Sequence, residues 1–284
     1  MAEKILITGA NGQLGTALTA ELTRRKIPHK GIDRAIADIT DRRAVMGVLH
    51  EYSPTAVMHC AAYTAVDRAE DEPELCRLVN VDGTRNIAMA CKEINAKLVY
   101  ISTDYVFAGD GDYFHKPTDP TNPQSVYGAS KLAGEMAVQE ILQKFFIVRT
   151  SWVYGENGGN FVKTMLKLGG ERDSVKVVND QIGSPTYTAD LAKLLCDMAI
   201  TEKYGIYHAT NEGVCSWAKF AEEIFTLAGL AAKVEHIPTA EYPTKAIRPL
   251  NSRLDKAKLY ASGFEKFPHW TDALHRYLEE NSTL

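Results

Sequence analysis

The sequence has no dense basic run and no long apolar run, and these two absences exclude large classes of protein. Its 32 lysines and arginines are outnumbered by 36 aspartates and glutamates, which gives a formal net charge of −4. We therefore expect no nucleic-acid groove and no polybasic membrane patch. No apolar run approaches the roughly 18 residues that span a bilayer, and no signal-peptide pattern is present. The expected protein is cytoplasmic and has a small molecule as its partner, with no nucleic acid and no membrane.

Cysteine is scarce and poorly spaced for cross-linking or metal binding. The chain has five cysteines, an odd number, and each lies at least 15 positions from the next. No Cys-x-x-Cys pair or Cys/His cluster suggests zinc. We therefore expect free, mostly buried thiols at Cys60, Cys76, Cys91, Cys196 and Cys215.

The chain has an ordinary globular composition. Its 284 residues, 45% apolar and 24% charged, suit one large domain or two joined ones. The first 150 residues alternate short β-branched runs with longer helical patterns, which predicts an α/β fold with a Rossmann-type doubly wound parallel sheet. The expected strands are 4–8, 30–33, 56–61, 98–102 and 146–149, and the expected helices are 13–25, 41–52, 74–95 and 125–144.

After Thr150 the pattern becomes less regular and predicts a smaller C-terminal α/β layer. A strand is expected at 175–179, and helices are expected from about Thr188, at 216–228 and at 269–280. The turn-rich stretch 238–249, with its prolines, threonines and tyrosine, suits a loop that lines a site.

A glycine-rich loop follows the first expected strand. The sequence Gly9-Ala10-Asn11-Gly12-Gln13-Leu14-Gly15 opens the first helix. Gly9 permits a tight turn, Gly12 lets the backbone approach a pyrophosphate, and Gly15 lets the helix pack on the strand. Because the loop lies at the first βα junction of a repeating βα chain, it predicts a dinucleotide site. Its members are Gly9, Asn11, Gly12, Gln13, Leu14 and Gly15.

Asp33 and Arg34 end the second expected strand, with Asp33 18 residues beyond Gly15. A carboxylate there favours the free 2′-hydroxyl of NAD, whereas an arginine can hold the 2′-phosphate of NADP. We therefore expect NADPH as the cofactor, with NADH as an alternative. Asp38 and Ile39 follow in the same stretch and are expected to face the adenine.

Three residues predict acid–base chemistry. Thr103 lies at the end of the fourth expected strand, and Tyr127 and Lys131 share one face of the next helix at positions i and i+4. A phenol is a poor proton donor at neutral pH until a nearby cation lowers its pKa, and we expect Lys131 to supply that charge. Thr103 is placed to donate a hydrogen bond to a carbonyl oxygen that receives the proton.

In this order, the glycine loop, Thr103, Tyr127 and Lys131 resemble the short-chain dehydrogenase/reductase superfamily. The loop spacing and the extra C-terminal layer look like its extended branch, which acts largely on nucleotide sugars. Further segments resemble the dTDP-4-dehydrorhamnose reductase family over nearly the whole chain. These segments are 61–70 (AAYTAVDRAE), 102–109, 149–155, 179–186 and 248–255.

The resemblance implies a role for each matching residue. Gly12, Gln13 and Leu14 would lie under the pyrophosphate, and Asp38 and Ile39 by the adenine. Further cofactor contacts would come from Ala61, Ala62, Tyr63 and Asn80, and from Tyr127 and Lys131 at the nicotinamide ribose. The substrate would meet Thr103, Asp104, Tyr127, Trp152 and Arg248, with the flat face of Trp152 suited to a sugar ring.

The resemblance also implies a domain division and a reaction. Residues 1–150 would form an NAD(P)-binding Rossmann domain to which 186–212 return, and 151–185 with 213–284 would bind substrate. The reaction would be hydride transfer from NAD(P)H to the 4-keto group of dTDP-6-deoxy-L-lyxo-4-hexulose, which gives dTDP-L-rhamnose. Two alternatives stay open: a reductase or epimerase of another nucleotide sugar, and a non-catalytic NADP-binding subunit resembling the regulatory subunit of methionine adenosyltransferase.

Metal binding and assembly have little sequence support. Some family members are linked to Mg²⁺, but Glu279 and Glu280 are adjacent on a terminal helix and point in different directions, so we expect no metal site. His59 is isolated from other ligand types and is expected to be a packed side chain. A homodimer through the helices 74–95 and 125–144 is suggested only by analogy with extended members.

Overall fold

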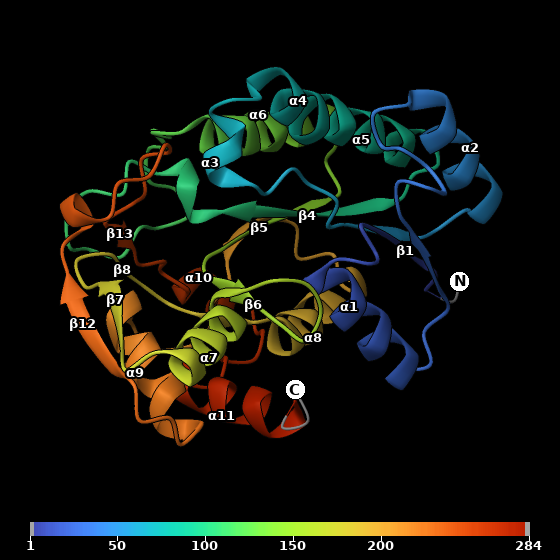
Figure 1. Cartoon of the computed structure of the whole chain (residues 1–284). Helices are drawn as coiled ribbons and strands as arrows, with labels where there is room; N and C mark the ends of the chain where they lie inside the picture. The colour runs from blue at the N-terminus through green and yellow to red at the C-terminus, as the bar shows by residue number, and fades with distance from the viewer. Residues whose placement is uncertain (1–2, 282–284) are drawn as a thin grey trace.

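Six parallel strands form the main sheet of the computed structural model, which describes residues 3–281 (Figure 1). The strand order is β10-β5-β4-β3-β1-β2, and every neighbouring pair is parallel. The order reverses between β1 and β3, so the predicted doubly wound α/β fold is confirmed. The strands are β1 (Ile5–Thr8), β2 (His29–Ile32), β3 (Ala56–His59), β4 (Lys97–Thr103), β5 (Phe145–Thr150) and β10 (Gly205–His208).

Helices cover both faces of this sheet (Figure 1). On one face, α1 (Gln13–Arg24) packs against α8 (Thr188–Ala199) through buried leucines such as Leu18 and Leu195. On the other face lie α2 (Arg42–Tyr52), α5 (Thr84–Glu93) and α6 (Val126–Ile141). The side chains of Asp41 and Ser125 cap the amides that begin α2 and α6.

The expected helix 74–95 is interrupted. It consists of α4 (Pro73–Arg77), a π-helix η1 (Leu78–Gly83) and α5, and a short helix α3 (Val66–Ala69) precedes it. The π-helix carries Asn80, whose side chain hydrogen-bonds the backbone of Tyr63 at 2.8 and 3.1 Å. The interruption therefore depends on a contact 17 residues away, which helical periodicity does not reveal.

A smaller layer lies beside the main sheet. Its longest strands, β7 (Ser174–Val178) and β12 (Lys233–Ile237), pair in parallel. The aromatic core of this layer includes side chains from the helices α7 (Phe161–Glu171), α9 (Trp217–Leu227) and α11 (Trp270–Glu280). The remaining elements are β6 (Val153–Tyr154), β8 (Ile182–Gly183), β9 (Thr186–Tyr187), β11 (Cys215–Ser216), β13 (Asn251–Ser252), α10 (Ala257–Ala261), η2 (Asp104–Val106) and η3 (Thr239–Glu241).

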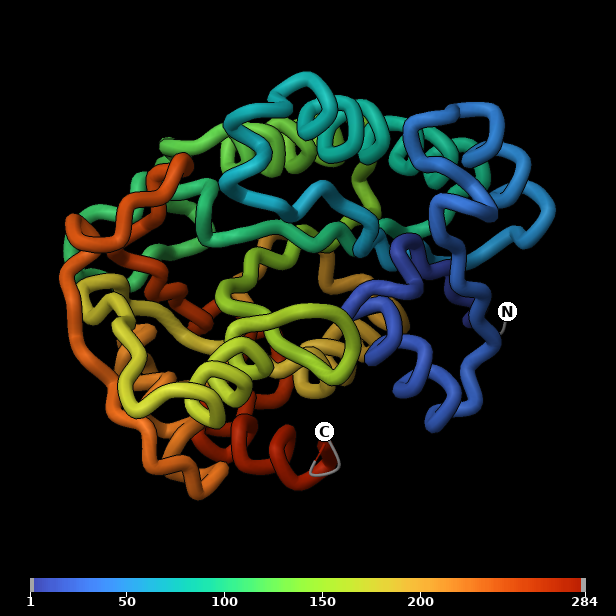
Figure 2. The backbone as a smooth tube through the Cα atoms, in the orientation of Figure 1, coloured from blue at the N-terminus to red at the C-terminus, as the bar shows by residue number. Residues whose placement is uncertain are grey.

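The segment from η3 to β13 returns to the loop that follows β4 (Figure 2). The amide of Asn251 donates to the carbonyl of Gly109 at 2.9 Å, and His115 exchanges backbone hydrogen bonds with Arg253 and Asp255. This segment, residues 238–255, is called the return segment below. It places C-terminal residues next to the carboxyl end of β4.

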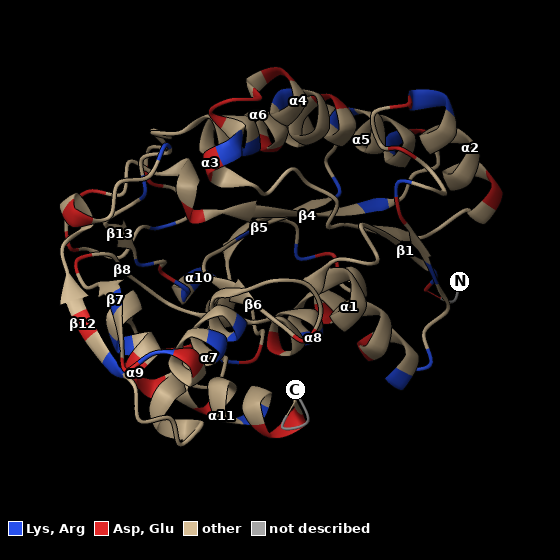
Figure 3. Cartoon of the chain, viewed as in Figure 1, with Lys and Arg blue, Asp and Glu red and all other residues tan. Residues whose placement is uncertain are grey.

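The state of the cysteines and the mixing of charges agree with the expectations from the sequence composition. All five thiols are free, and four are buried. Acidic and basic residues are interspersed over both halves of the molecule in the view of Figure 3. Within residues 3–281, no helix combines the length and apolar character needed to cross a membrane.

Candidate active site

A cavity of about 340 Å³ lies at the carboxyl ends of β1, β2 and β3. Gly9 adopts φ +65°, and a Cβ on it would lie 2.7 Å from the amide nitrogen of Ala61, so only glycine fits this turn. The cavity brings together most of the predicted cofactor residues. They are Gly9, Asn11, Gly12, Asp33, Arg34, Asp38, Ile39, Ala61, Ala62 and Tyr63.

The remaining residues of the glycine loop do not line this cavity. A Cβ on Gly15 would lie 2.2 Å from the carbonyl oxygen of Gly9, so Gly15 lets α1 pack closely on the loop that follows β1, whereas packing on the strand was predicted. Leu14 is buried in the core, and the Gln13 side chain accepts a hydrogen bond from Asn160 at 3.2 Å. Any contact of Leu14 with a pyrophosphate is therefore left to its backbone amide.

The start of α1 fits a diphosphate. Gly12 is its N-cap, and no side chain among the described residues caps its first amides. Uncapped amides at a helix N-terminus offer donors and a partial positive charge to an anion. The loop thus supplies both the space and the donors that a dinucleotide requires.

The acidic and basic residues after β2 form a connected rim. Asp33 accepts hydrogen bonds from the Asn11 side chain at 2.5 Å and from the amides of Ala35 and Ile36. Arg34 is 87% exposed and donates to Asp38 at 3.0 Å. Hydrogen bonds from Thr40 lower the pKa of Asp38. The exposed Arg34 guanidinium fits the 2′-phosphate of NADP.

Asn80 lies behind this cavity rather than on its wall. It is buried and donates to the hydroxyl of Ser130 at 2.9 Å as well as bonding Tyr63. Its hydrogen bonds fix the segment after β3 against α6. Asn80 therefore holds in place the segment that carries Ala61, Ala62 and Tyr63, and it does not itself line the cavity.

Thr103 and Tyr127 meet at the carboxyl end of β4. Thr103 is the last residue of that strand, and its side chain opposes the effect of burial on the pKa of the Tyr127 phenol. Gly128 allows this approach, because a Cβ there would lie 2.3 Å from the carbonyl oxygen of Tyr105. The Tyr127 ring meets the Tyr105 ring edge-on, with centroids 5.5 Å apart.

Lys131 lies deeper, 3% exposed, with its Nζ 4.1 Å from the centroid of the Tyr100 ring. Burial lowers the pKa of Lys131 to about 7, against the opposing effect of the Glu135 carboxylate. Burial raises the pKa of Tyr127, and Thr103 is the main opposing influence. The expected lowering of the Tyr127 pKa by Lys131 stays a prediction.

Sequence reasoning missed a buried ion pair beside Lys131. Glu135, one turn further along α6, accepts two hydrogen bonds from Arg149 at 2.8 and 2.7 Å and one from Ser102 at 2.5 Å. The Glu135 side chain is fully buried. Its position at i+4 from Lys131 was the available signal.

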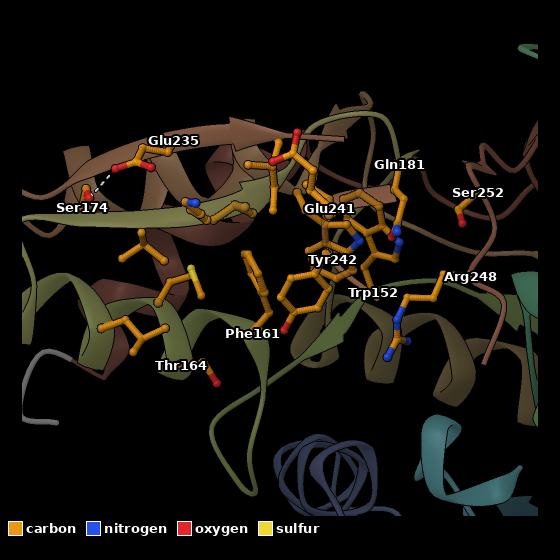
Figure 4. Close-up of a pocket in the computed structure, with 18 of the residues that line it drawn as sticks. Trp152, Phe161, Thr164, Ser174, Gln181, Glu235, Glu241, Tyr242, Arg248 and Ser252 are labelled. Atoms are coloured by element: carbon orange, nitrogen blue, oxygen red, sulfur yellow. Dashed lines mark hydrogen bonds between the residues drawn. The ribbon is translucent and has the colours of Figure 1, made fainter. Parts of the chain in front are cut away.

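A second, larger cavity of about 840 Å³ lies between α7, β7, α9 and the return segment (Figure 4). The predicted substrate residues Trp152 and Arg248 line it. Arg248 donates to the Tyr105 hydroxyl at 3.1 Å and pairs with Asp67 at 2.5 Å. The expected site-lining stretch 238–249 contributes Tyr242 to this cavity. Further lining residues that sequence reasoning missed include Tyr105, Phe161, Gln181, Trp217 and Ser252.

Asp104 connects the end of β4 to this cavity. It accepts hydrogen bonds from Thr103 at 3.0 Å and from Ser252, a cavity residue of the return segment. Burial raises the pKa of Asp104 to about 6. Thr103 contacts Asp104, and Tyr127 contacts the cavity residue Tyr105, so both Thr103 and Tyr127 lie beside the larger cavity. Lys131 extends from α6, the helix that also carries Tyr127, towards the end of β3.

Trp152 packs on a second tryptophan. Its indole stacks on that of Trp217, with centroids 3.7 Å apart and planes at 15°. One face of the Trp152 indole is therefore covered by protein, and its contact with a sugar stays a prediction. No signal local to Trp152 in the sequence identified Trp217 as its neighbour, because the two residues meet only in the fold.

Other predicted or rejected ligands have ordinary contacts. His59 is buried between Thr8 and Thr84, and burial lowers its pKa to about 3. Glu280 accepts a hydrogen bond from the Tyr187 hydroxyl at 2.5 Å. Within residues 3–281, no group of three or more His, Cys, Asp or Glu side chains is arranged to hold a metal ion.

Comparison with known proteins identifies the family of this chain. The family model described as RmlD substrate binding domain matches residues 3–283. The dTDP-4-dehydrorhamnose reductase of Streptomyces griseus is 45% identical, over 95% of this chain and 91% of that protein. A Bacillus anthracis dTDP-4-dehydrorhamnose reductase structure in complex with NADP superposes with a TM-score of 0.97 at 46% identity, covering 99% of this chain and 100% of that chain.

A structure with lower sequence identity has the same fold. The Thermus thermophilus UDP-glucose 4-epimerase in complex with NAD has a TM-score of 0.85 at 22% identity, covering 97% of this chain and 98% of that chain. At that identity only the fold is shared. The family match and the two reductases determine the assignment: the chain belongs to the dTDP-4-dehydrorhamnose reductase family of extended short-chain dehydrogenases/reductases.

Proposed function

We propose that this chain reduces the 4-keto group of dTDP-6-deoxy-L-lyxo-4-hexulose with NADPH and forms dTDP-L-rhamnose. The observation that carries the proposal is the meeting of Thr103, at the end of β4, with Tyr127 beside the larger cavity, on the helix that also carries Lys131. A regulatory cofactor-binding subunit would not need these three side chains together. The likeness to dTDP-4-dehydrorhamnose reductases supports the substrate.

NADPH supplies a hydride when it is bound, and the chain supplies binding, orientation and the proton. Gly9, Gly12 and the first amides of α1 would hold the diphosphate, and Arg34 the 2′-phosphate. Lys131 would hold the nicotinamide ribose. Asp33 would bind the adenosine ribose in NADH, which makes NADH a second possible cofactor.

The side chains at the end of β4 carry the proton chemistry. Tyr127 transfers the proton of its phenol to the 4-keto oxygen, which becomes the 4-hydroxyl as the carbon accepts the hydride. Thr103 donates a hydrogen bond to the same oxygen and so polarises the carbonyl. The Lys131 ammonium stabilises the resulting Tyr127 phenolate, whose pKa burial otherwise raises. Trp152, Asp104 and Arg248 hold the sugar nucleotide.

The two halves of the chain would divide these tasks. We propose that residues 1–150 with 186–212 form the cofactor domain and that 151–185 with 213–284 form the substrate domain. The pairing of β10 with β5 and the packing of α8 on α1 support the return of 186–212. We also propose that the protein works in the cytoplasm as a homodimer through α5 and α6, where Met136 is exposed.

Purified protein tests the function directly. NADPH oxidation would be followed at 340 nm with a panel of 4-keto nucleotide sugars that differ in base and sugar, and the products identified by NMR. We expect turnover with the dTDP-linked 4-keto-6-deoxyhexose and dTDP-L-rhamnose as the product. Turnover only with another sugar nucleotide would favour the alternative substrate, and NADPH binding without any turnover would favour the regulatory role. Light scattering of the same sample would test the dimer.

A further inference from the structure

The larger cavity contains a stacked pair of tryptophans from two distant elements. Trp152 follows β5, and Trp217 is the first residue of α9. Their centroids lie 3.7 Å apart, and both residues line the cavity. Phe161, the first residue of α7, packs on Trp217 with centroids 4.5 Å apart. The stack therefore links three parts of the cavity wall.

Trp152 is held in an unfavourable backbone conformation. Its φ is +50°, in the left-handed region that disfavours side chains other than glycine. Among the described residues, the other non-glycine positions with positive φ are Lys26, Ser53 and Asn95, which all end helices. Trp152 has no such local reason. Its conformation must be maintained by tertiary contacts.

The Thr186 amide donates to the Trp152 carbonyl oxygen at 3.1 Å and helps to hold this backbone. Two further contacts hold the indole. Trp217 covers one face of the Trp152 indole. Gly183 makes room beside its six-membered ring, because a Cβ there would lie 2.9 Å from Cε2 of Trp152. Gly183 only permits the indole position, whereas Trp217 stabilises it, since stacked aromatic pairs attract beyond their burial.

The polar edge of Trp152 remains available. An indole Nε1–H is a hydrogen-bond donor only, and a buried one usually finds a partner. Hydrogen bonds to Trp152 Nε1 are absent among residues 3–281, although Trp152 lines the cavity. The ring face is used by Trp217, and the donor edge has no protein acceptor.

We infer that Trp217 is a positioning residue for substrate binding, which fixes the Trp152 indole so that its Nε1–H, rather than its ring face, meets an oxygen of the sugar nucleotide. This inference rests on the proposed function for the identity of the ligand. Trp217 acts through Trp152, so removing Trp217 costs affinity only while the Trp152 donor is present. The cofactor cavity shares neither residue.

A double-mutant cycle tests this dependence. Binding of dTDP-L-rhamnose would be measured by calorimetry for the wild type, Trp152→Phe, Trp217→Phe and the double variant. We expect each single variant to bind dTDP-L-rhamnose about tenfold more weakly than the wild type. The double variant should bind it at most about twofold more weakly than Trp152→Phe. NADPH affinity should stay within about twofold in all four proteins. In steady state, Trp217→Phe should raise KM while kcat changes less than about threefold.

Circular dichroism reports the stack itself. Two indoles this close give an exciton couplet in the far ultraviolet, and both single variants should abolish it. Trp270→Phe is the matched control, because Trp270 is a buried tryptophan of the same layer that packs on Phe220 and not on the pair. It should retain the couplet and the affinity for dTDP-L-rhamnose. Trp217→Ala repeats the test without any aromatic ring.

Several results would overturn the inference. Additive losses in the double variant would show that Trp217 acts independently of Trp152. Unchanged affinity in Trp217→Phe after loss of the couplet would show that the stack is irrelevant to binding. A wild type that binds dTDP-L-rhamnose but reduces no 4-keto sugar would contradict the proposed function instead, and the binding cycle would still decide the role of Trp217.

Discussion

The two cavities are built in different ways. The cofactor cavity is walled by short segments at the ends of three neighbouring strands, and its shape depends on backbone approaches such as Gly9 to Ala61. The larger cavity is walled by side chains from segments far apart in the sequence, including Tyr105, Trp152, Trp217 and Arg248. The first is therefore encoded locally and the second by tertiary packing.

The largest expected effect lies at the carboxyl end of β4. Tyr127→Phe removes the proton donor and leaves the ring that contacts Tyr105. We expect kcat to fall by at least about 100-fold, the low end for general acid catalysis, while the dissociation constants of NADPH and dTDP-L-rhamnose change less than about threefold. Steady-state kinetics and calorimetry would measure both. Tyr113→Phe, at an exposed tyrosine, is the control, and near-normal turnover in Tyr127→Phe would remove Tyr127 from the mechanism.

On the substrate side, Asp104 makes stability depend on pH. Burial raises the pKa of Asp104 from 3.8 to about 6, so the folded chain binds more protons than the unfolded chain between these values. Stability from this group is present below about pH 4 and is lost as pH rises through 6. The free energy of unfolding of the wild type minus that of Asp104→Asn should fall by about 2 kcal/mol from pH 4 to pH 7. Urea unfolding across this range measures it, and a flat difference would contradict the buried position of Asp104.

On the cofactor side, Gly9→Ala places a Cβ against the Ala61 backbone at a left-handed φ. We expect a loss of about 2 kcal/mol in stability and at least about tenfold in NADPH affinity, with binding of dTDP-L-rhamnose unchanged. Thermal unfolding and calorimetry measure these effects. Gly47→Ala is the matched control, because a Cβ there meets nothing within 4 Å and helix propensity favours alanine. Equal losses in both variants would contradict the assigned cavity.

The smallest expected effect concerns the choice of cofactor. Arg34→Ala should weaken NADPH binding by about fivefold and leave NADH binding unchanged, because an exposed charge contributes modestly. The difference should shrink as salt is added. Fluorescence titration of each nucleotide measures it. Arg43→Ala, an exposed change of the same charge outside the cavity, should have no effect, and equal weakening of NADH would contradict a 2′-phosphate contact.

The same contrast explains what could be predicted from the sequence. The glycine loop, Asp33 and Thr103 were predictable because each follows a recognisable strand, and parallel strands bring their carboxyl ends to one edge. Trp217 and Ser252 were not, because they reach the cavity through α9 and the return segment. The π-helix at Asn80 and the net effect of burial on Tyr127 depend on contacts that no local pattern records.

The most direct test of the central claim uses NADPH that carries deuterium at the transferred position. The protein would convert dTDP-6-deoxy-L-lyxo-4-hexulose, and the product would be examined by NMR and mass spectrometry. The account predicts dTDP-L-rhamnose with one deuterium at carbon 4 and one NADPH consumed per product. Product without deuterium at carbon 4, or no consumption of NADPH, would contradict a reductase that transfers hydride to the 4-keto carbon.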